Sequence, residues 1–445
     1  MQRYKKYSAN PTVAIVGRPN VGKSTLFNRI TGQRRSIVSG ESGTTRDRVL
    51  SETEWGGKPF LLVDTGGLDL FAETDLWNQV RGQIKYAIDE SDVIIFLVDI
   101  SDGITSADRD VVDLLRITGK PTLLVASKAD NDERISRVSD LYELGLGNPI
   151  PISAYHNIGL ENLMEQTLKH FPDESGFAEP EVDLRLAIVG RTNVGKSMLM
   201  NTITGENRAI VSEISGTTRD ALDTVIKYEQ REIQIIDTAG IRRRGNIQQG
   251  IEKYSVLRSV KAISRCDVAV LVLDASEVAT GQDTHVANYI LDAYKGMIIA
   301  INKWDLSKPM GLGKKEIETQ VRDKFKFASY TPICFISALY GAGINELLNT
   351  TLRVQTEWSK GIPRPDLRRT ILSAVAEHPP ASQGRKELKI YSALQDGTMP
   401  PSFTFFVNHS DMIHFSYRRY LENRLRDEYT FEGSPLRFRF RGWKG

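Results

Sequence analysis

The sequence predicts two α/β domains in tandem, followed by a smaller α+β domain. The first observation is an internal repeat, because AIVGRPNVGKSTLFNRITG at 14–32 returns at 187–205 as AIVGRTNVGKSMLMNTITG. The second is a series of short apolar runs, such as VIIFLV and VAVLVL, that alternate with helical patterns. Continuous apolar strands separated by helices are typical of a mostly parallel sheet with both faces covered by helices.

The repeat extends through further motifs and sets the domain boundaries. GTTRD occurs at 43–47 and 216–220, and apolar strands lead into DTGG at 64–67 and DTAG at 237–240. The segment 172–183 holds five acidic residues, no basic residue and two prolines, a composition typical of an exposed linker. We therefore expect a first domain at 1–171, a linker at 172–183, a second domain at 184–360 and a C-terminal domain at 361–445.

Composition and charge favour a cytosolic protein with a basic C-terminal domain. Charged residues make up 26% of the chain, and the formal net charge is only +2. From residue 361 onward, however, 14 Lys and Arg stand against 9 Asp and Glu, which is typical of a polyanion-binding surface or of a solvated face. The two cysteines provide no disulfide framework, and no apolar stretch approaches the roughly 20 residues that span a bilayer. We expect no membrane attachment.

A phosphate-binding motif occurs once in each copy. GRPNVGKS at 17–24 and GRTNVGKS at 190–197 both fit GxxxxGK[ST] between an apolar strand and a helix, the pattern of a P-loop. The glycines let backbone N–H groups converge on phosphates, the lysine bridges phosphate oxygens, and the serine ligates Mg²⁺. The residues expected to bind nucleotide here are Gly17, Arg18, Pro19, Asn20, Val21, Gly22, Lys23, Ser24 and Thr25, and Gly190, Arg191, Thr192, Asn193, Val194, Gly195, Lys196, Ser197 and Met198.

Two further motifs complete the expected sites for Mg²⁺ and the γ-phosphate. Asp64 and Asp237 end apolar strands and can hold Mg²⁺ through its water shell, while Gly67 and Gly240 offer a backbone N–H to the γ-phosphate. In each GTTRD motif, either of two adjacent threonines can supply the hydroxyl that closes over Mg²⁺, and we favour the second. The expected metal ligands are Ser24, Thr45, Asp64, Ser197, Thr218 and Asp237.

The choice of base is predicted by motifs that follow two later strands of the second copy. The Asp305 carboxylate can accept from guanine N1–H and N2–H₂, for which adenine has no matching donor pair. Asn302 would bond to N7, and the stem of Lys303 would pack over the ring. A backbone N–H at Ser337-Ala338 would bond to O6.

The first copy departs from this pattern at one position. Ser127 replaces the asparagine, followed by Lys128 and Asp130, and then by Ser153-Ala154. A serine can make one hydrogen bond fewer, which typically costs about 0.5–1.5 kcal/mol. We therefore expect a GTP site in the first copy too, with weaker binding.

Hydrolysis needs a group other than the usual glutamine. Leu68 and Ile241 occupy the position at which many small GTPases orient the attacking water with glutamine. Asn20 and Asn193 resemble the asparagine that holds K⁺ in potassium-activated members of the wider superfamily, although they can also simply brace the loop. The residues expected to take part in catalysis are Asn20, Lys23, Thr45, Gly67, Asn193, Lys196, Thr218 and Gly240.

The last domain resembles a KH-like fold, an RNA-binding class. Its pattern is helix (367–378), strand (388–394), strand (402–408), helix (412–429) and strand (436–441). No GxxG loop lies between two predicted helices, so base-specific reading of a single strand is not expected. The alternation RFRFR at the end predicts phenylalanines inward and arginines outward, toward either RNA phosphates or a G domain. The candidate RNA contacts are Arg418, Arg419, Arg437, Arg439 and Arg441.

With these motifs, the chain resembles the EngA/Der family of bacterial GTPases over essentially all 445 residues. The segments 239–263 and 406–441 look like that family's second switch and C-terminal domain. The resemblance implies two tandem P-loop G domains, which hydrolyse GTP to GDP with Mg²⁺, followed by a KH-like domain. From Asn20 and Asn193 we expect K⁺ to stimulate the reaction. The resemblance also implies a nucleotide-dependent switch in assembly of the large ribosomal subunit, with ribosomal particles and rRNA as partners. We expect a monomer.

Two other functions stay open at this point. One is a tRNA-modifying GTPase, because GTTRD also occurs in that class. Its members are expected to end in a catalytic cysteine, whereas this chain ends in Gly-Trp-Lys-Gly. The other is an RNA-binding, nucleotide-sensing scaffold with little hydrolysis, which the apolar Leu68 and Ile241 keep possible.

Overall fold

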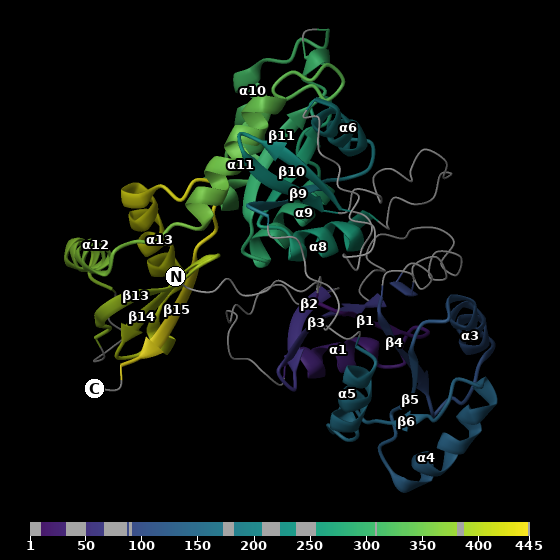
Figure 1. Cartoon of the computed structure of the whole chain (residues 1–445). Coiled ribbons are helices and arrows are strands. Elements are labelled where there is room, and N and C mark those ends of the chain that lie inside the picture. The colour runs from purple at the N-terminus through teal and green to yellow at the C-terminus, as the bar shows by residue number, and fades with distance from the viewer. Residues whose placement is uncertain are drawn as a thin grey trace. The chain divides into compact units, whose positions relative to one another are not determined.

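The computed structural model describes residues 10–32, 50–65, 87–88, 91–171, 182–206, 223–236, 255–307, 309–380 and 387–443. The chain divides into two compact units, 1–177 and 178–445, and this boundary falls inside the segment expected as a linker. The second unit contains both the second α/β domain and the C-terminal domain (Figure 1). Within the described ranges, no helix is long and apolar enough to cross a bilayer.

The sheet of the first unit has the strand order β2-β3-β1-β4-β5-β6. Neighbouring strands are parallel, except that β2 runs antiparallel to β3 at one edge. Strands β1 and β4 are buried along their whole length, as their continuous apolar sequences predict. The elements are β1 (Thr12–Val16), α1 (Lys23–Gly32), β2 (Leu50–Trp55), β3 (Lys58–Asp64), β4 (Val93–Asp99), α3 (Ser106–Thr118), β5 (Thr122–Ser127), α4 (Asp132–Ser136), η2 (Arg137–Leu144), β6 (Ile150–Pro151) and α5 (Leu160–Lys169).

The second unit repeats this sheet. Its order is β12-β11-β10-β7-β9-β8, the same order read from the other edge, again with one antiparallel edge strand. The prediction of two mostly parallel sheets is therefore confirmed. The elements are β7 (Leu184–Val189), α6 (Lys196–Glu206), β8 (Thr224–Tyr228), β9 (Arg231–Ile236), α8 (Ser255–Arg265), β10 (Val268–Asp274), α9 (Gly281–Asp292), β11 (Gly296–Asn302), η6 (Trp304–Leu306), α10 (Lys314–Lys324), η7 (Lys326–Ala328), β12 (Ile333–Phe335) and α11 (Ile344–Trp358).

The antiparallel edge strands β2 and β8 were not among the strands predicted from apolar runs. Their sequences, LSETEW and TVIKY, mix polar and apolar residues. An edge strand needs to bury less surface than a central one, so it lacks the continuous apolar signal that reveals the other strands.

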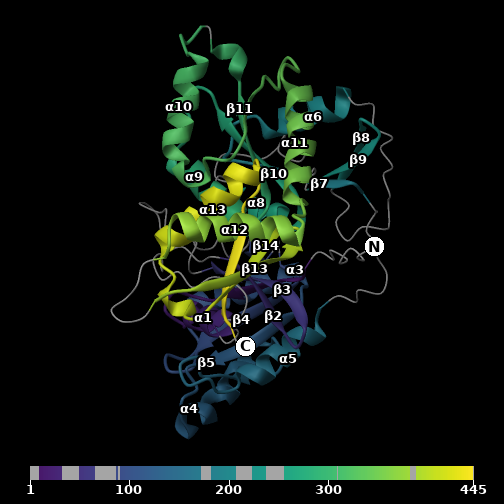
Figure 2. The same ribbon diagram turned by 90° about the vertical axis from the view of Figure 1, so that its left-hand side faces the viewer.

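The C-terminal domain follows the predicted order of elements. They are α12 (Arg364–Glu377), β13 (Ile390–Thr398), β14 (Pro401–Val407), η8 (Ser410–Met412), α13 (Phe415–Tyr429) and β15 (Arg437–Gly442). Strand β14 pairs antiparallel with β13 and parallel with β15, and α12 and α13 share a core with the sheet (Figure 2). The second helix begins at Phe415 rather than Met412, because 410–412 form a 3₁₀ turn and His414 caps the helix.

This domain is hydrogen-bonded to the second α/β domain through the segment between α13 and β15. The Met297 N–H at the start of β11 donates to the Gly433 carbonyl at 2.7 Å, and the Gly433 N–H donates to the Tyr330 carbonyl at 2.9 Å. The Arg426 guanidinium lies 3.5 Å from the Tyr330 ring centroid, where a cation and an aromatic face attract each other. Burial raises the pKa of Tyr330 well above its usual value. These contacts join the C-terminal domain to the second α/β domain within one compact unit.

We expect Gly433→Val to loosen this junction. Gly433 has φ +66°, and an added Cβ would lie 2.6 Å from Val354 Cγ2 and 2.9 Å from the Met297 carbonyl oxygen. Overpacking and a strained backbone together predict a loss of about 2–4 kcal/mol in the free energy of unfolding of the second unit. Thermal unfolding followed by calorimetry measures it. Gly361→Ala is the control, because its nearest atom, Thr398 Cγ2, is 3.8 Å away. Equal melting temperatures of the two variants would contradict the role of Gly433 at this junction.

Candidate nucleotide-binding sites

Each P-loop lies between a central strand and the helix that follows it, at the carboxyl edge of its sheet. The buried Lys23 Nζ donates to the carbonyls of Gly17 and Arg18 at 2.9 and 2.8 Å. Lys196 Nζ makes the same two bonds in the second copy, one of them to Gly190 at 2.6 Å. Both ammonium groups are thus held against the loop, where phosphate oxygens would meet them.

The backbone of the loops has the strained conformation that their composition predicts. Gly22 and Gly195 have φ values of +99° and +94°, and Asn20 and Asn193 have +67° and +62°. Asparagine tolerates the left-handed region better than most other residues with a side chain. A Cβ added at Gly195 would lie 2.2 Å from Asn302 Nδ2, so this position also needs glycine for close packing.

Asn302 joins the second P-loop to the loop that follows β12. Its Nδ2 donates to the Val194 carbonyl at 2.8 Å, and its Oδ1 accepts from the Ala338 N–H at 2.9 Å. An amide nitrogen carries two hydrogens, so one remains for an acceptor such as guanine N7. A backbone N–H at Ser337-Ala338 was expected to bond guanine O6. If it is that of Ala338, guanine O6 would have to share the donor with Asn302.

The first copy keeps only half of this bridge. Ser127 Oγ donates to the Val21 carbonyl at 2.7 Å, the bond equivalent to that between Asn302 and Val194. Because a hydroxyl has a single hydrogen, this bond leaves none for an acceptor such as guanine N7. Within the part of the chain that the structure describes, the Ser127 side chain makes no bond to the Ala154 N–H.

The serine that follows β6 or β12 orients the carboxylate expected to bind guanine. Ser153 Oγ donates to Asp130 Oδ1 at 2.6 Å, and Ser337 Oγ donates to Asp305 Oδ1 at 2.5 Å. Sequence reasoning had assigned to this motif only a backbone N–H. In the first copy, Arg134 also donates to Asp130 Oδ2 at 2.7 Å, so both of its carboxylate oxygens are engaged.

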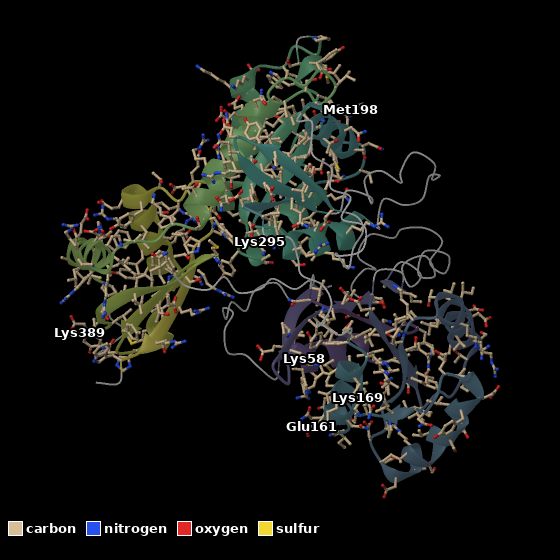
Figure 3. The ribbon with its side chains drawn as sticks, viewed as in Figure 1. Lys58, Glu161, Lys169, Met198, Lys295 and Lys389 are labelled. Atoms are coloured by element: carbon tan, nitrogen blue, oxygen red, sulfur yellow. The ribbon has the colours of Figure 1, made fainter. Side chains whose placement is uncertain are left out.

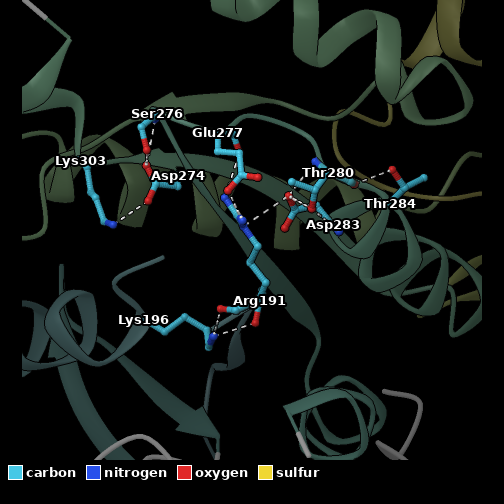
Figure 4. A network of polar contacts seen from close by, with 10 residues as sticks. Arg191, Lys196, Asp274, Ser276, Glu277, Thr280, Asp283, Thr284 and Lys303 are labelled. Carbon is cyan, nitrogen blue, oxygen red and sulfur yellow. Dashed lines mark hydrogen bonds and ion pairs between the residues drawn. The ribbon is translucent and has the colours of Figure 1, made fainter. Parts of the chain in front are cut away.

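The lysine of each base motif is anchored by an aspartate on the neighbouring strand. Lys128 Nζ lies 2.5 Å from Asp99 Oδ2, and Lys303 Nζ lies 2.6 Å from Asp274 Oδ2 (Figure 4). Burial opposes ionisation of Asp274, but hydrogen bonds from Lys303 and Ser276 bring the pKa of its carboxyl below the usual value. Both aspartates end apolar strands at equivalent places in the repeat, a signal that the sequence contained and that we missed.

The arginine of each P-loop ties the loop to the segment that follows β4 or β10 and leads into α3 or α9. Arg191 lies 2.5 Å from Glu277 and 3.8 Å from the buried Asp283, which forms a capping box with Thr280 at the start of α9 (Figure 4). Arg18 makes the equivalent contacts, with Asp102 at 2.5 Å and with Asp108 at 3.6 Å. Asp108 forms the capping box of α3 with Thr105. A hydrogen bond and the positive charge of Arg18 hold the pKa of the Asp102 carboxyl below its usual value. The side chain of each arginine is therefore paired with acidic residues outside the P-loop. Its backbone carbonyl accepts from the P-loop lysine.

The expected Mg²⁺ ligands fall partly within the described residues. Ser24 is exposed at the start of α1, and Asp64 is buried at the end of β3, beside Ile15 of β1. A hydroxyl and a carboxylate at one sheet edge are the oxygen donors that Mg²⁺ prefers. In the second copy, Met198 is 45% exposed next to the half-buried Ser197 (Figure 3). Residues outside the described part are Thr45, Gly67, Leu68, Thr218, Asp237, Gly240 and Ile241.

The arginines of the C-terminal domain do not share one environment. The Arg437 guanidinium lies 4.8 Å from the ring centroid of Tyr294 in the second α/β domain, so this arginine lies against a G domain instead of pointing outward to RNA. Arg439 forms an ion pair with Asp396 at 3.1 Å. Of the remaining candidates, Arg418 is half-buried, whereas Arg419 and Arg441 are exposed. Phe438 is buried, as the alternation predicts.

Known proteins match the whole of this arrangement. A family model described as a 50S ribosome-binding GTPase matches residues 12–128 and again 185–303. A second model, described as the KH-domain-like C-terminal part of EngA bacterial GTPase enzymes, matches residues 362–441. The two matches to the first model cover β1 to β5 and β7 to β11, and the match to the second covers the C-terminal domain.

Relatives are similar over nearly their full length. GTPase Der from Chloroflexus aggregans is 48% identical over 439 residues, which are 97% of this chain and 98% of the relative. GTPase Der from Thermomicrobium roseum is 48% identical over 441 residues, covering 97% and 96%. Among solved structures, Era in complex with MgGDPNP and a 16S ribosomal RNA fragment is 21% identical, covers 74% of this chain and 91% of its own, and has a TM-score of 0.31.

We expect Ser337→Ala to weaken GDP binding at the second site only. The variant removes the hydroxyl that orients the Asp305 carboxylate, and a hydrogen bond to a partly exposed charged group is worth about 1–2 kcal/mol, or roughly five- to thirtyfold in affinity. Titration calorimetry of the full chain with GDP resolves the two classes of site. Ser153→Ala is the matched variant for the first site. If Ser337→Ala leaves both affinities unchanged, the hydroxyl does not orient the carboxylate.

Proposed function

The chain belongs to the EngA/Der family of GTPases, and we propose that it hydrolyses GTP at both sites as a switch in assembly of the large ribosomal subunit. The family implies GTP, GDP and Mg²⁺ as ligands. One observation carries the proposal. Both α/β domains contain the same set of contacts, which includes the bonds of the P-loop lysine and those of the base-motif carboxylate. A basic KH-like domain belongs to the same chain. We propose ribosomal particles and rRNA as its partners.

The side chains divide the work between phosphates and base. Lys23 and Lys196 would bind β- and γ-phosphate oxygens, together with the backbone N–H groups of the loops. Asp130 and Asp305 would accept from the guanine N–H groups. Mg²⁺, held by Ser24 and its counterparts, supplies positive charge to the phosphates when bound.

We also propose that K⁺ stimulates hydrolysis. Neither Leu68 nor Ile241 can orient a water molecule, so the charge that develops on the phosphates needs another partner. Asn20 and Asn193 are exposed within their P-loops, and an amide oxygen there is a suitable ligand for a monovalent cation.

The arrangement of the second unit supports coupling between nucleotide and RNA. Strand β11 carries Asn302 of the base motif at one end, and at its other end Met297 bonds to Gly433 of the C-terminal domain. A change at the base pocket would thus act on a strand to which the RNA-binding domain is directly attached.

GTP turnover should rise when K⁺ replaces Na⁺ at constant ionic strength. Asn193→Ala should remove the part of the response that belongs to the second site, while Asn20→Ala should remove the part of the first. Phosphate release under steady-state conditions measures both. Equal rates in the two salts would rule out the K⁺ proposal, and no turnover in either salt would favour the scaffold with little hydrolysis.

RNA binding should depend on exposed arginines through phosphate contacts. Replacing Arg419 and Arg441 with Gln should weaken association with ribosomal particles and lower the dependence of log K on log salt by about 2, near one per lost contact. Arg437→Gln is the control, because this arginine lies against Tyr294. Co-sedimentation over a salt series, with GDP or a non-hydrolysable GTP analogue, measures both. An unchanged slope in the double variant would exclude this surface from RNA binding.

A further inference from the structure

We propose that Arg29 positions the base-recognition loop of the first site, in place of the bond that Ser127 does not make. The inference rests on the proposed guanine pocket of the first domain. Arg29 lies on α1, and its Nε donates to the Ala154 carbonyl at 2.9 Å. Its Nη2 donates to the Tyr155 carbonyl at 2.7 Å. Both carbonyls belong to the loop that follows β6.

The choice of partners by Arg29 is informative. A guanidinium usually pairs with a carboxylate on a protein surface. Among the described residues, Arg29 forms no ion pair, and its two printed contacts go to neighbouring backbone carbonyls. Its planar fork suits two acceptors at once, so it can fix both the position and the orientation of the loop.

The second copy identifies what Arg29 replaces. Thr202 occupies the equivalent position, six residues after the P-loop lysine, and its Oγ1 donates to the Ala338 carbonyl at 2.6 Å. The Ala338 N–H is held by Asn302. In the second copy, one side chain of α6 and one of β11 each bond to the backbone of Ala338. In the first copy, Arg29 on α1 makes both of the corresponding side-chain bonds, to Ala154 and Tyr155.

This exchange explains how the first site tolerates its serine. Ser127 keeps the bond to the P-loop carbonyl of Val21 but does not reach the Ala154 N–H. Backbone bonds hold Ile152 to Ala126 and Ala129. Arg29 adds side-chain bonds to the carbonyls of Ala154 and Tyr155, directly after Ser153, which orients Asp130. Arg29 acts on the base through these neighbours and touches no phosphate, so it is a positioning residue.

The test uses the full chain with the second site blocked by Gly195→Val, whose Cβ would meet Asn302 Nδ2 at 2.2 Å. Four chains are compared: the Gly195→Val chain itself, and the same chain with Arg29→Thr, with Ser127→Asn or with both. GDP binding is measured with a fluorescent analogue, and GTP hydrolysis is measured at steady state. Arg29→Thr should raise the Kd for GDP and the KM for GTP about tenfold and leave kcat within twofold. The double variant carries the pair found in the second copy, so it should return to within threefold of the starting chain.

The control is Arg116→Thr, because Arg116 also donates to a backbone carbonyl, that of Leu144 at the end of η2, and it plays no part in the proposed site. It should leave the Kd unchanged. If Arg29→Thr lowers the melting temperature, Arg29→Lys replaces it, since lysine keeps the charge but cannot reach both carbonyls in one plane. An unaltered Kd, or a loss that Ser127→Asn fails to restore, overturns the proposal. A background chain that binds no GDP overturns the first guanine pocket itself.

Discussion

Each nucleotide site depends on one hydrogen bond between the P-loop and the end of the strand that leads into the base motif. The carbonyl of Val21 or Val194, inside the P-loop, accepts from the side chain that ends β5 or β11. That side chain begins the base motif, so the bond fixes the distance between the phosphate-binding and base-binding parts of each site. The close approach needs glycine at Gly195, where any Cβ would meet the Asn302 amide. In the second copy, Gly195 of the P-loop and the Asn302 amide of the base motif therefore pack directly against each other.

The two copies satisfy this constraint with different residues. In the second, the Asn302 amide reaches both the P-loop and the next loop, and Asp305 accepts from Ser337. In the first, a serine serves the P-loop alone, and Arg134 occupies one oxygen of Asp130. Guanine entering the first site would have to compete with Arg134 for that oxygen. Both differences agree with the expected weaker binding at the first site.

Sequence patterns predicted the repeated sheets, the phosphate loops and the order of the C-terminal elements, because each rests on a local signal of composition and spacing. The edge strands β2 and β8 escaped prediction because they are short and half polar. Arg29 escaped because its acceptors are backbone carbonyls 125 and 126 residues away, which no side-chain pattern marks. Arg437 illustrates a third limit. The alternation with phenylalanine predicted that Arg437 points away from the core of its own domain. Its contact with Tyr294 depends on how that domain packs against the second α/β domain.

The central claim is that the chain holds two guanine sites, each read by its own carboxylate. Nucleotide binding to the full chain carrying Asp130→Asn, Asp305→Asn or both tests it most directly. An amide can donate to the C2 carbonyl of xanthine, so each single variant should bind one GDP and one xanthosine diphosphate, and the double variant two of the latter. If Asp305→Asn still binds two equivalents of GDP and no xanthosine diphosphate, this carboxylate does not read the base, and the account of the site is wrong.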